Sequence, residues 1–406
     1  MKEISGGVTA ALGFTANGVH AGVKAGSNPA KNDLALIVSE RDCAAAATYT
    51  LNRVKAAPLY VTMGHLEDGC ARAILANSGN ANACAPFSHE YAERSCAAAA
   101  KITGLRPSDF VVASTGVIGQ TINVQAIEDA LPALYAGLSR DGSDAAARAI
   151  MTTDTVKKEY AVQVEIGGKT VTLGGIAKGS GMIHPNMGTM LCFLTSDCAI
   201  THEMLEDALR TVVPRTFNRV TVDGDTSTND MCVILANGMA GNPLIEWKDS
   251  NYQAFLAALT ELCTYMARHI AADGEGASRL ITCSVSGARS EDTAERLAKS
   301  VVGSSLVKAA MFGADANWGR VLCAMGYSKA PFRPEDVCVS FRSSAGEIAV
   351  CSGGEALDFD EALAKEILLQ DAVDIVITLN EGDGEAVCWG CDLTYDYVKI
   401  NGDYRT

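Results

Sequence analysis

A glycine-rich stretch near the middle of the chain, residues 178–191 (KGSGMIHPNMGTML), constrains the fold more than any other segment. Its glycines, Gly179, Gly181 and Gly188, open backbone angles that other residues avoid, and its proline removes an amide donor. The stretch is therefore predicted to be an irregular loop. An apolar run, residues 189–195, follows at once and has the length of a buried strand.

Thr189 stands where this loop enters the predicted strand. A hydroxyl held with little freedom could act as a nucleophile, because the attacking oxygen must lie about 3 Å from the reacting carbon. The alternative is a threonine at a strand edge whose hydroxyl bonds to its own backbone. Residue type and spacing alone leave both interpretations open.

The composition indicates a protein with a large core. The chain has 406 residues, of which 48% are hydrophobic and 20% charged, so we expect two or three domains, or one α/β body with a companion lobe. The net charge of -15 disfavours nucleic acid and anionic membrane surfaces as partners, because both attract basic proteins. No apolar run approaches the roughly 18 residues that cross a bilayer.

The N-terminal sequence MKEISGGVTAALGF lacks the apolar centre of a secretory signal and the basic amphipathic character of a transit peptide. The fourteen cysteines are scattered singly through apolar segments, which is typical of reduced thiols in a cytosolic protein. We therefore expect a cytoplasmic protein without disulfides.

Strand and helix patterns alternate along the chain. Period-3.6 patterns predict helices, the fourth of which is capped by Thr201, at residues 89–102, 126–138, 144–150, 202–212 and 252–272. Short apolar or alternating runs predict strands at residues 34–40, 71–76, 110–114, 231–236, 279–286, 337–341, 346–351, 374–380 and 386–400, with a hairpin turning at Gly167 and Gly168. Strands mixed with helices favour a layered α/β fold in which helices cover sheets.

A second notable spot is residues 110–120 (FVVASTGVIGQ), where a buried-strand pattern runs into Ser114, Thr115 and Gly116. A strand that ends in a small, glycine-containing turn can present backbone N–H groups to a cavity. The same pattern also fits an ordinary junction between a strand and a turn.

Other candidate sites have weaker patterns. Cys388 and Cys391 form a CxxC without the second pair that a structural zinc site needs, which favours two core thiols and no metal. The acidic loop 223–230 lacks the full calcium-loop pattern, and residues 174–181 (GGIAKGSG) do not match the spacing of a nucleotide-binding loop. His184 has no acid partner in the sequence pattern, so a loop role is favoured over a chemical one.

Nine motifs nonetheless occur in a fixed order: GFTANGVHAGVK, ILANSGNANAC, ASTGVIG, IMTTDT, KGSGMIHPNMGTML, DGDTSTND, GEGAS, GADANWGR and CDLTYDYVKINGDYRT. Together they resemble, over nearly the whole chain, the ornithine acetyltransferase family, the bifunctional glutamate N-acetyltransferases of arginine biosynthesis. The resemblance implies an α/β fold, with a layered helix-sheet-sheet-helix body of the aminopeptidase/ornithine acetyltransferase type and a smaller C-terminal lobe from about residue 280.

Members of this family cut themselves immediately before the threonine of the central motif. The resemblance places the break between Gly188 and Thr189, giving an alpha chain 1–188 and a beta chain 189–406. Gly188 replaces the alanine that is usual in the family, and glycine should tolerate a strained peptide at least as well. The freed α-amine of Thr189 could then act as its base, since its reference pKa is about 7.7 to 8.0.

The resemblance also implies the activity: transfer of acetyl from N2-acetylornithine to L-glutamate through an acetyl-Thr189 ester, without a cofactor. Acetyl-CoA stays open as a second donor, and a heterotetramer of two alpha and two beta chains is implied. Thr115 and Gly116 would form the oxyanion hole. The residues implied to bind substrate are Thr152, Lys178, Thr189, Glu275, Asn401 and Thr406.

Two alternatives remain. A related self-processed aminopeptidase or amidohydrolase would use the same nucleophile and would release free acetate even when glutamate is abundant. A non-catalytic amino-acid-binding protein would use the same pocket and would keep an intact chain of 406 residues.

Overall fold

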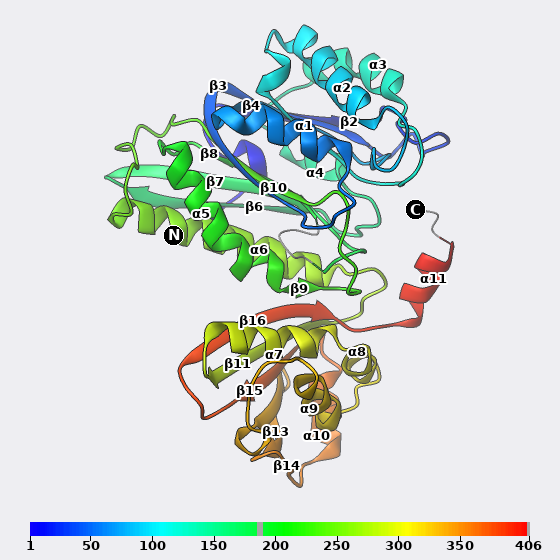
Figure 1. Cartoon of the computed structure of the whole chain (residues 1–406), viewed down its shortest axis with the longest axis vertical. Helices are drawn as coiled ribbons and strands as arrows, with labels where there is room; N and C mark the ends of the chain where they lie inside the picture. Colours follow the sequence, from blue (N-terminus) through cyan, green and yellow to red (C-terminus); the bar gives the residue numbers. More distant parts are fainter. Residues whose placement is uncertain (185–189, 404–406) are drawn as a thin grey trace.

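The computed structural model describes residues 1–184 and 190–403. These residues form a large α/β body, built mainly from the first 272 residues, and a smaller C-terminal lobe that lies beneath it in Figure 1. The layered α/β architecture predicted from the sequence is thus confirmed.

The body contains one hydrogen-bonded sheet of nine strands among the described residues, in the order β1-β6-β7-β8-β10-β3-β4-β5 with β2 also paired to β3. Its strands are β1 Lys2–Ile4, β2 Phe14–Val19, β3 Leu34–Tyr49, β4 Cys70–Asn77, β5 Phe110–Ser114, β6 Lys158–Ile166, β7 Lys169–Lys178, β8 Leu191–Ser196 and β10 Met231–Ala236.

The long strand β3 folds this sheet into two layers. The first half of β3 pairs with β2 and β4, whereas its second half pairs with β10. The strand predicted from the sequence ends at Glu40, and the alanine-rich segment that follows it has low intrinsic strand propensity. Its pairing with β10 and its burial between the layers override that propensity. The two layers bury a shared core that includes Phe14, Ile37 and Phe193.

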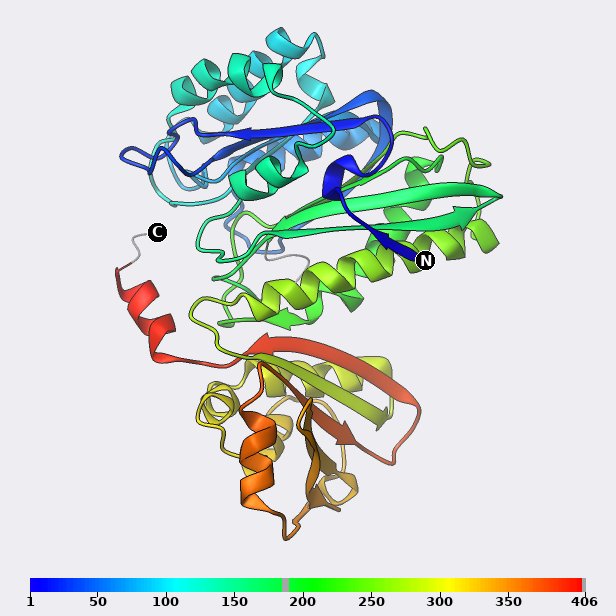
Figure 2. The same cartoon turned by 180° about the vertical axis from the view of Figure 1, so that it is seen from behind.

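Helices cover both outer faces of the body (Figures 1 and 2). On one side, α2 packs against α1 and α3, and α1 packs against β5. On the other side α6 lies along β6 and β7. The predicted cap of α5 is confirmed, because the Thr201 side chain accepts a hydrogen bond from the Met204 amide. The helices are α1 Ala57–His65, α2 Ser88–Thr103, α3 Val124–Ala136, α4 Ser143–Ala149, α5 His202–Arg215 and α6 Ser250–Ala272.

The C-terminal lobe has its own core and a second sheet, which the short body strand β9 joins at one edge. In the described chain this sheet has seven strands in the order β14-β13-β12-β15-β11-β16-β9. They are β9 Val220–Thr221, β11 Leu280–Ala288, β12 Cys338–Ser343, β13 Gly346–Ser352, β14 Glu355–Ala356, β15 Ala372–Thr378 and β16 Gly384–Cys391. Its helices, none of which the sequence analysis assigned, are α7 Glu291–Gly303, α8 Ser305–Phe312, α9 Trp318–Gly326 and α10 Glu361–Leu368.

One strand prediction is wrong at its end. The run 386–400 was predicted to be strand throughout, but β16 stops at Cys391 and the chain continues as helix α11 (Tyr395–Asp403). Asp392 ends the strand, since its carboxylate accepts hydrogen bonds from the amides of Ser278 and Arg279. Helix α11 then lies beside the body (Figures 1 and 2).

Candidate active site

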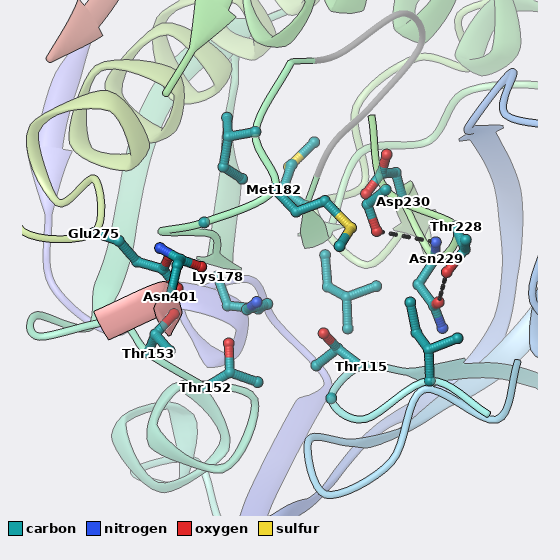
Figure 3. A pocket seen from close by; sticks show the side chains of 17 residues that line it. Thr115, Thr152, Thr153, Lys178, Met182, Thr228, Asn229, Asp230, Glu275 and Asn401 are labelled. Atoms are coloured by element: carbon teal, nitrogen blue, oxygen red, sulfur yellow. Dashed lines mark hydrogen bonds between the residues drawn. The ribbon is translucent and has the colours of Figure 1, made fainter. Parts of the chain in front are cut away.

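The described structure brings six of the predicted site residues to one cavity, which we call the central cavity (Figure 3). Its empty volume is about 720 Å³, counting the part open to solvent. The predicted residues that line it are Thr115, Gly116, Thr152, Lys178, Glu275 and Asn401.

Sheet register explains why distant segments meet here. Lys178, at the end of β7, pairs with Leu191 at the start of β8, and Leu191 pairs with Met231 at the start of β10. The segments that flank these strand ends therefore lie at one edge of the sheet. Met190 and Asp230, the residues just before β8 and β10, both line the central cavity.

The Thr115–Gly116 turn needs glycine. Strands β4 and β5 are parallel, so they end at the same edge, where the Thr115 amide donates to the Asn77 carbonyl at 2.9 Å. Gly116 has φ +125°, a conformation that side chains disfavour. A Cβ on Gly116 would also lie 2.9 Å from the backbone nitrogen of Asn80. The turn can therefore follow this path only with glycine.

Two buried asparagines hold the loops around this turn. Asn77 donates through Nδ2 to Ser114 Oγ at 2.7 Å and accepts the Asn80 amide at 3.1 Å. Asn229 donates through Nδ2 to the carbonyls of Ala81 and Ser114, at 2.6 and 2.8 Å. Three loops that are distant in sequence are thereby fixed to one another. The sequence analysis did not predict Asn229 as a site residue.

Lys178 is buried, with 7% of its surface exposed, and extends from the floor of the central cavity between two groups of polar residues (Figure 3). Burial lowers the pKa of Lys178, while the charge of Asp154 opposes that effect. Such an amine is suited to bind an anionic group of a ligand.

Glu275 and Asn401 lie on one side of Lys178, with Thr152 nearby (Figure 3). Asn401, on helix α11, donates through Nδ2 to Glu275 Oε2 at 2.8 Å. Gly181 makes room for this carboxylate, because a Cβ there would lie 2.2 Å from Glu275 Oε2. An amine and a carboxylate thus line the same cavity, an arrangement suited to a ligand that carries both charges.

Thr228, Asn229 and Asp230 lie on the other side of the cavity (Figure 3). Asp230 is 2% exposed, and burial raises its pKa well above the ordinary value for a carboxyl. Its Oδ2 atom has no hydrogen-bond partner in the described part of the chain. In the sequence these residues belong to the acidic loop 223–230, whose pattern favours a solvated or capping loop over a cation site.

Some predictions fall outside the described residues. Gly188 and Thr189, at the predicted cleavage site, and Thr406 are among them. The central cavity is also lined by Ile183 and Met190, which lie on either side of residues 185–189 in the sequence.

The weaker candidates have structural roles where they are described. Asp223, in the acidic loop, accepts hydrogen bonds from the amides of Met182 and Ile183. His184 lies 3.0 Å from Thr221 Oγ1 through Nδ1, and burial lowers its pKa to about 4. Cys388 and Cys391 are buried free thiols, as predicted, and all fourteen cysteines are free. Among residues 1–184 and 190–403, no helix is long and apolar enough to cross a membrane.

Comparisons with known proteins agree on one family. A model of the ArgJ family matches residues 15–406. The chain is 50% identical to the arginine biosynthesis bifunctional protein ArgJ of Symbiobacterium thermophilum, over 100% of both chains. It is 48% identical to arginine biosynthesis bifunctional protein ArgJ 1 of Clostridium acetobutylicum, over 97% of this chain and 96% of the relative.

A solved structure is also similar. The crystal structure of the arginine biosynthesis bifunctional protein of Bacillus halodurans is 45% identical, with a TM-score of 0.51. The match covers 100% of that solved chain but only 53% of this one.

Proposed function

Because this chain belongs to the ArgJ family and is an acetyltransferase of arginine biosynthesis, we propose that it transfers acetyl from N2-acetylornithine to L-glutamate through an ester on Thr189. The observation that carries this proposal is the central cavity. It gathers Thr115, Gly116, Lys178 and Glu275, and it is also lined by Met190, which follows Thr189 in the chain.

The first half-reaction forms the ester. The Thr189 hydroxyl oxygen attacks the acetyl carbonyl carbon of N2-acetylornithine, and its proton passes to the Thr189 α-amine. We assign the Thr115 hydroxyl and the Gly116 amide to the developing oxyanion, since donors fixed before the reaction stabilise charge without reorganisation. The carbon–nitrogen bond then breaks, and the leaving amine of ornithine takes the proton.

The second half-reaction reverses these steps with glutamate. Its amine attacks the ester carbonyl, Thr189 recovers its proton and N-acetylglutamate leaves. We assign Lys178 to a substrate carboxylate and Glu275 to a substrate ammonium, because their charges are complementary to these groups. Thr152, Asn401 and Thr406 complete the proposed substrate-binding set, and no cofactor takes part.

Self-cleavage between Gly188 and Thr189 is the second part of the proposal, because it creates the α-amine that serves as base. This cleavage is supported by the solved chain from Bacillus halodurans. The match covers all of that solved chain but 53% of this one. A separate fragment 189–406 would make up about the same share of this chain. We further propose that fragments 1–188 and 189–406 stay together as a heterotetramer. The free thiols favour the cytoplasm as the place of the reaction.

The proposed function is tested by the products. Purified protein given N2-acetylornithine and an excess of glutamate should form ornithine and N-acetylglutamate in equal amounts, with little free acetate. Acetate as the main product would establish the hydrolase alternative, and absence of any turnover with an intact chain would favour an amino-acid-binding protein. A parallel assay with acetyl-CoA decides whether it is a second donor.

Replacing Thr115 with alanine should lower kcat by about 10²- to 10³-fold, the usual effect of removing one oxyanion-hole donor. The KM for N2-acetylornithine should change little, because the charge that Thr115 contacts develops only in the transition state. Steady-state kinetics measure both constants. A large rise in KM with unchanged kcat would instead make Thr115 a substrate-binding residue.

The pH profile of kcat/KM should be bell-shaped. Its rising limb reports the Thr189 α-amine, which acts as a base only when neutral, and nearby positive charge on Lys178 should move this limb below the reference pKa of about 7.7 to 8.0. Its falling limb reports Lys178, whose pKa burial lowers, because the neutral amine no longer attracts a carboxylate. The charged groups that act on Lys178 are Lys31, Asp154, Lys158, Asp230 and Glu275. A profile without a rising limb would contradict the assignment of the α-amine as base.

A further inference from the structure

Three buried charged side chains form a cluster next to residues that line the central cavity. Lys158 Nζ is 2.7 Å from Asp154 Oδ1 and 2.6 Å from Asp273 Oδ2. The side chains of Lys158, Asp154 and Asp273 are 1%, 0% and 6% exposed. We call these three residues the buried ion cluster. Burying charges is costly, so a cluster of this kind is weak evidence for stability and calls for another explanation.

One end of the cluster holds two parts of the cavity wall. Asp154 Oδ2 accepts a hydrogen bond from the Thr152 amide at 3.0 Å. Asp154 Oδ1 accepts another from the Gly179 amide at 2.7 Å, and Gly179 directly follows Lys178. A single carboxylate thus fixes the backbone at Thr152 and next to Lys178, both of which line the central cavity.

The other end of the cluster holds the part of the cavity wall that carries Glu275. The Asp273 carboxylate accepts the Thr155 amide at 3.1 Å, while its backbone carbonyl accepts the Ser180 hydroxyl at 2.7 Å. The Ser180 carbonyl in turn accepts the Glu275 amide at 3.0 Å. The position of Glu275 is therefore tied to Asp273 through one residue of the central loop.

We propose that the buried ion cluster is a positioning device for substrate, in which Lys158 joins Asp154 to Asp273 and so sets the distance between the Lys178 and Glu275 ends of the cavity. Asp154, Lys158 and Asp273 are not among the described residues that line the cavity, so they act through Thr152, Lys178 and Glu275. This inference rests on the proposed function, because it concerns how well N2-acetylornithine fits between these ends.

The charges support the same role. Burial acts to raise the pKa of Asp154, but the charges of Lys178 and Lys158 and the hydrogen bonds to Asp154 outweigh it and hold that pKa below its ordinary value. Asp154 therefore stays ionised, and its charge favours the protonated form of Lys178.

The variant that tests the proposal is Lys158→Met, which keeps much of the side-chain length and removes the bridging charge. We expect the KM for N2-acetylornithine to rise about tenfold, which corresponds to about 1.4 kcal/mol, while kcat stays within about threefold of the wild type. We expect KM to change without a matching change in kcat, because the proposed oxyanion donors, Thr115 and Gly116, lie on other elements. Asp154→Asn should have the same effect on KM.

The matched control is Asp197→Asn. Asp197 directly follows strand β8, whereas the central cavity lies at the beginning of that strand. Asp197 is also a buried carboxylate, and it accepts the amides of Thr172 and Leu12 at 2.7 and 3.0 Å. This variant should lower the melting temperature without changing KM. If Lys158→Met does not fold, the double variant Asp154→Asn/Lys158→Met, which removes both charges of a pair, takes its place in the same comparison.

The outcomes distinguish failure of the proposed function from failure of the positioning role. A wild-type protein that transfers no acetyl overturns the proposed function before any variant is compared. If the wild type is active, an unchanged KM in cut, folded cluster variants overturns the positioning role alone. A variant that stays uncut also contradicts the proposal, because the cluster would then act on self-processing and not on substrate fit.

Discussion

Thr189→Ala is expected to yield one uncut chain of 406 residues without measurable acetyl transfer. The substitution removes the oxygen that we assign both to self-cleavage and to attack on the acetyl group. No other group in the proposed mechanism supplies a nucleophile, so both losses should be complete. Denaturing electrophoresis and a coupled assay for ornithine release measure the two effects.

The control for this variant is Thr195→Val, in strand β8. Thr195 is fully buried, and its hydroxyl donates to the Val8 carbonyl at 2.9 Å. Its replacement should lower stability by about 1–3 kcal/mol, the cost of leaving a buried acceptor unpaired. The chain should nonetheless be cut and active. Substantial transfer by Thr189→Ala would remove Thr189 from the mechanism.

Lys178→Met should raise the KM for both N2-acetylornithine and glutamate by about 10²-fold, because removing one member of a buried charge pair typically costs 2–5 kcal/mol. Methionine fills much of the same space, so the fold should be retained. Initial-rate kinetics and a thermal melt measure these effects together.

Lys169→Met is the control for Lys178→Met. Lys169 is the exposed residue at the other end of the same strand, β7. Its charge lies on the surface, where it is screened and contributes little. Kinetic constants like those of the wild type are expected. If Lys178→Met also bound both substrates normally, Lys178 would not be a substrate ligand, and the carboxylate would need another partner.

The sequence predicts the body of the fold well where local patterns are strong. Helix α6 has a complete apolar face and an Asp249 cap, and β10 is a continuous apolar run, so both could be assigned from period and composition alone. The second half of β3 and helix α11 could not. Alanine-rich strand depends on its partners, and α11 begins after only three residues that follow β16.

The site residues were predicted mainly from family motifs and less from local sequence patterns. The residues that were not predicted show why. Asn229 bonds to Ser114, 115 residues away in sequence, and Lys158 bonds to Asp273 over the same separation. These contacts depend on the register of parallel strands and on a loop beyond α6, which no local window encodes. The sequence identifies such residues as polar but not as neighbours.

The central claim is that acetyl is carried on Thr189, and mass spectrometry after rapid mixing tests it most directly. Wild-type protein is mixed with N2-acetylornithine alone, quenched in acid within the first turnover and measured under denaturing conditions. The account predicts two fragments, residues 1–188 and 189–406, with one acetyl group on the second fragment only and about one ornithine released per site. A single full-length chain, or two fragments without acetyl while acetyl transfer to glutamate proceeds normally, would contradict it.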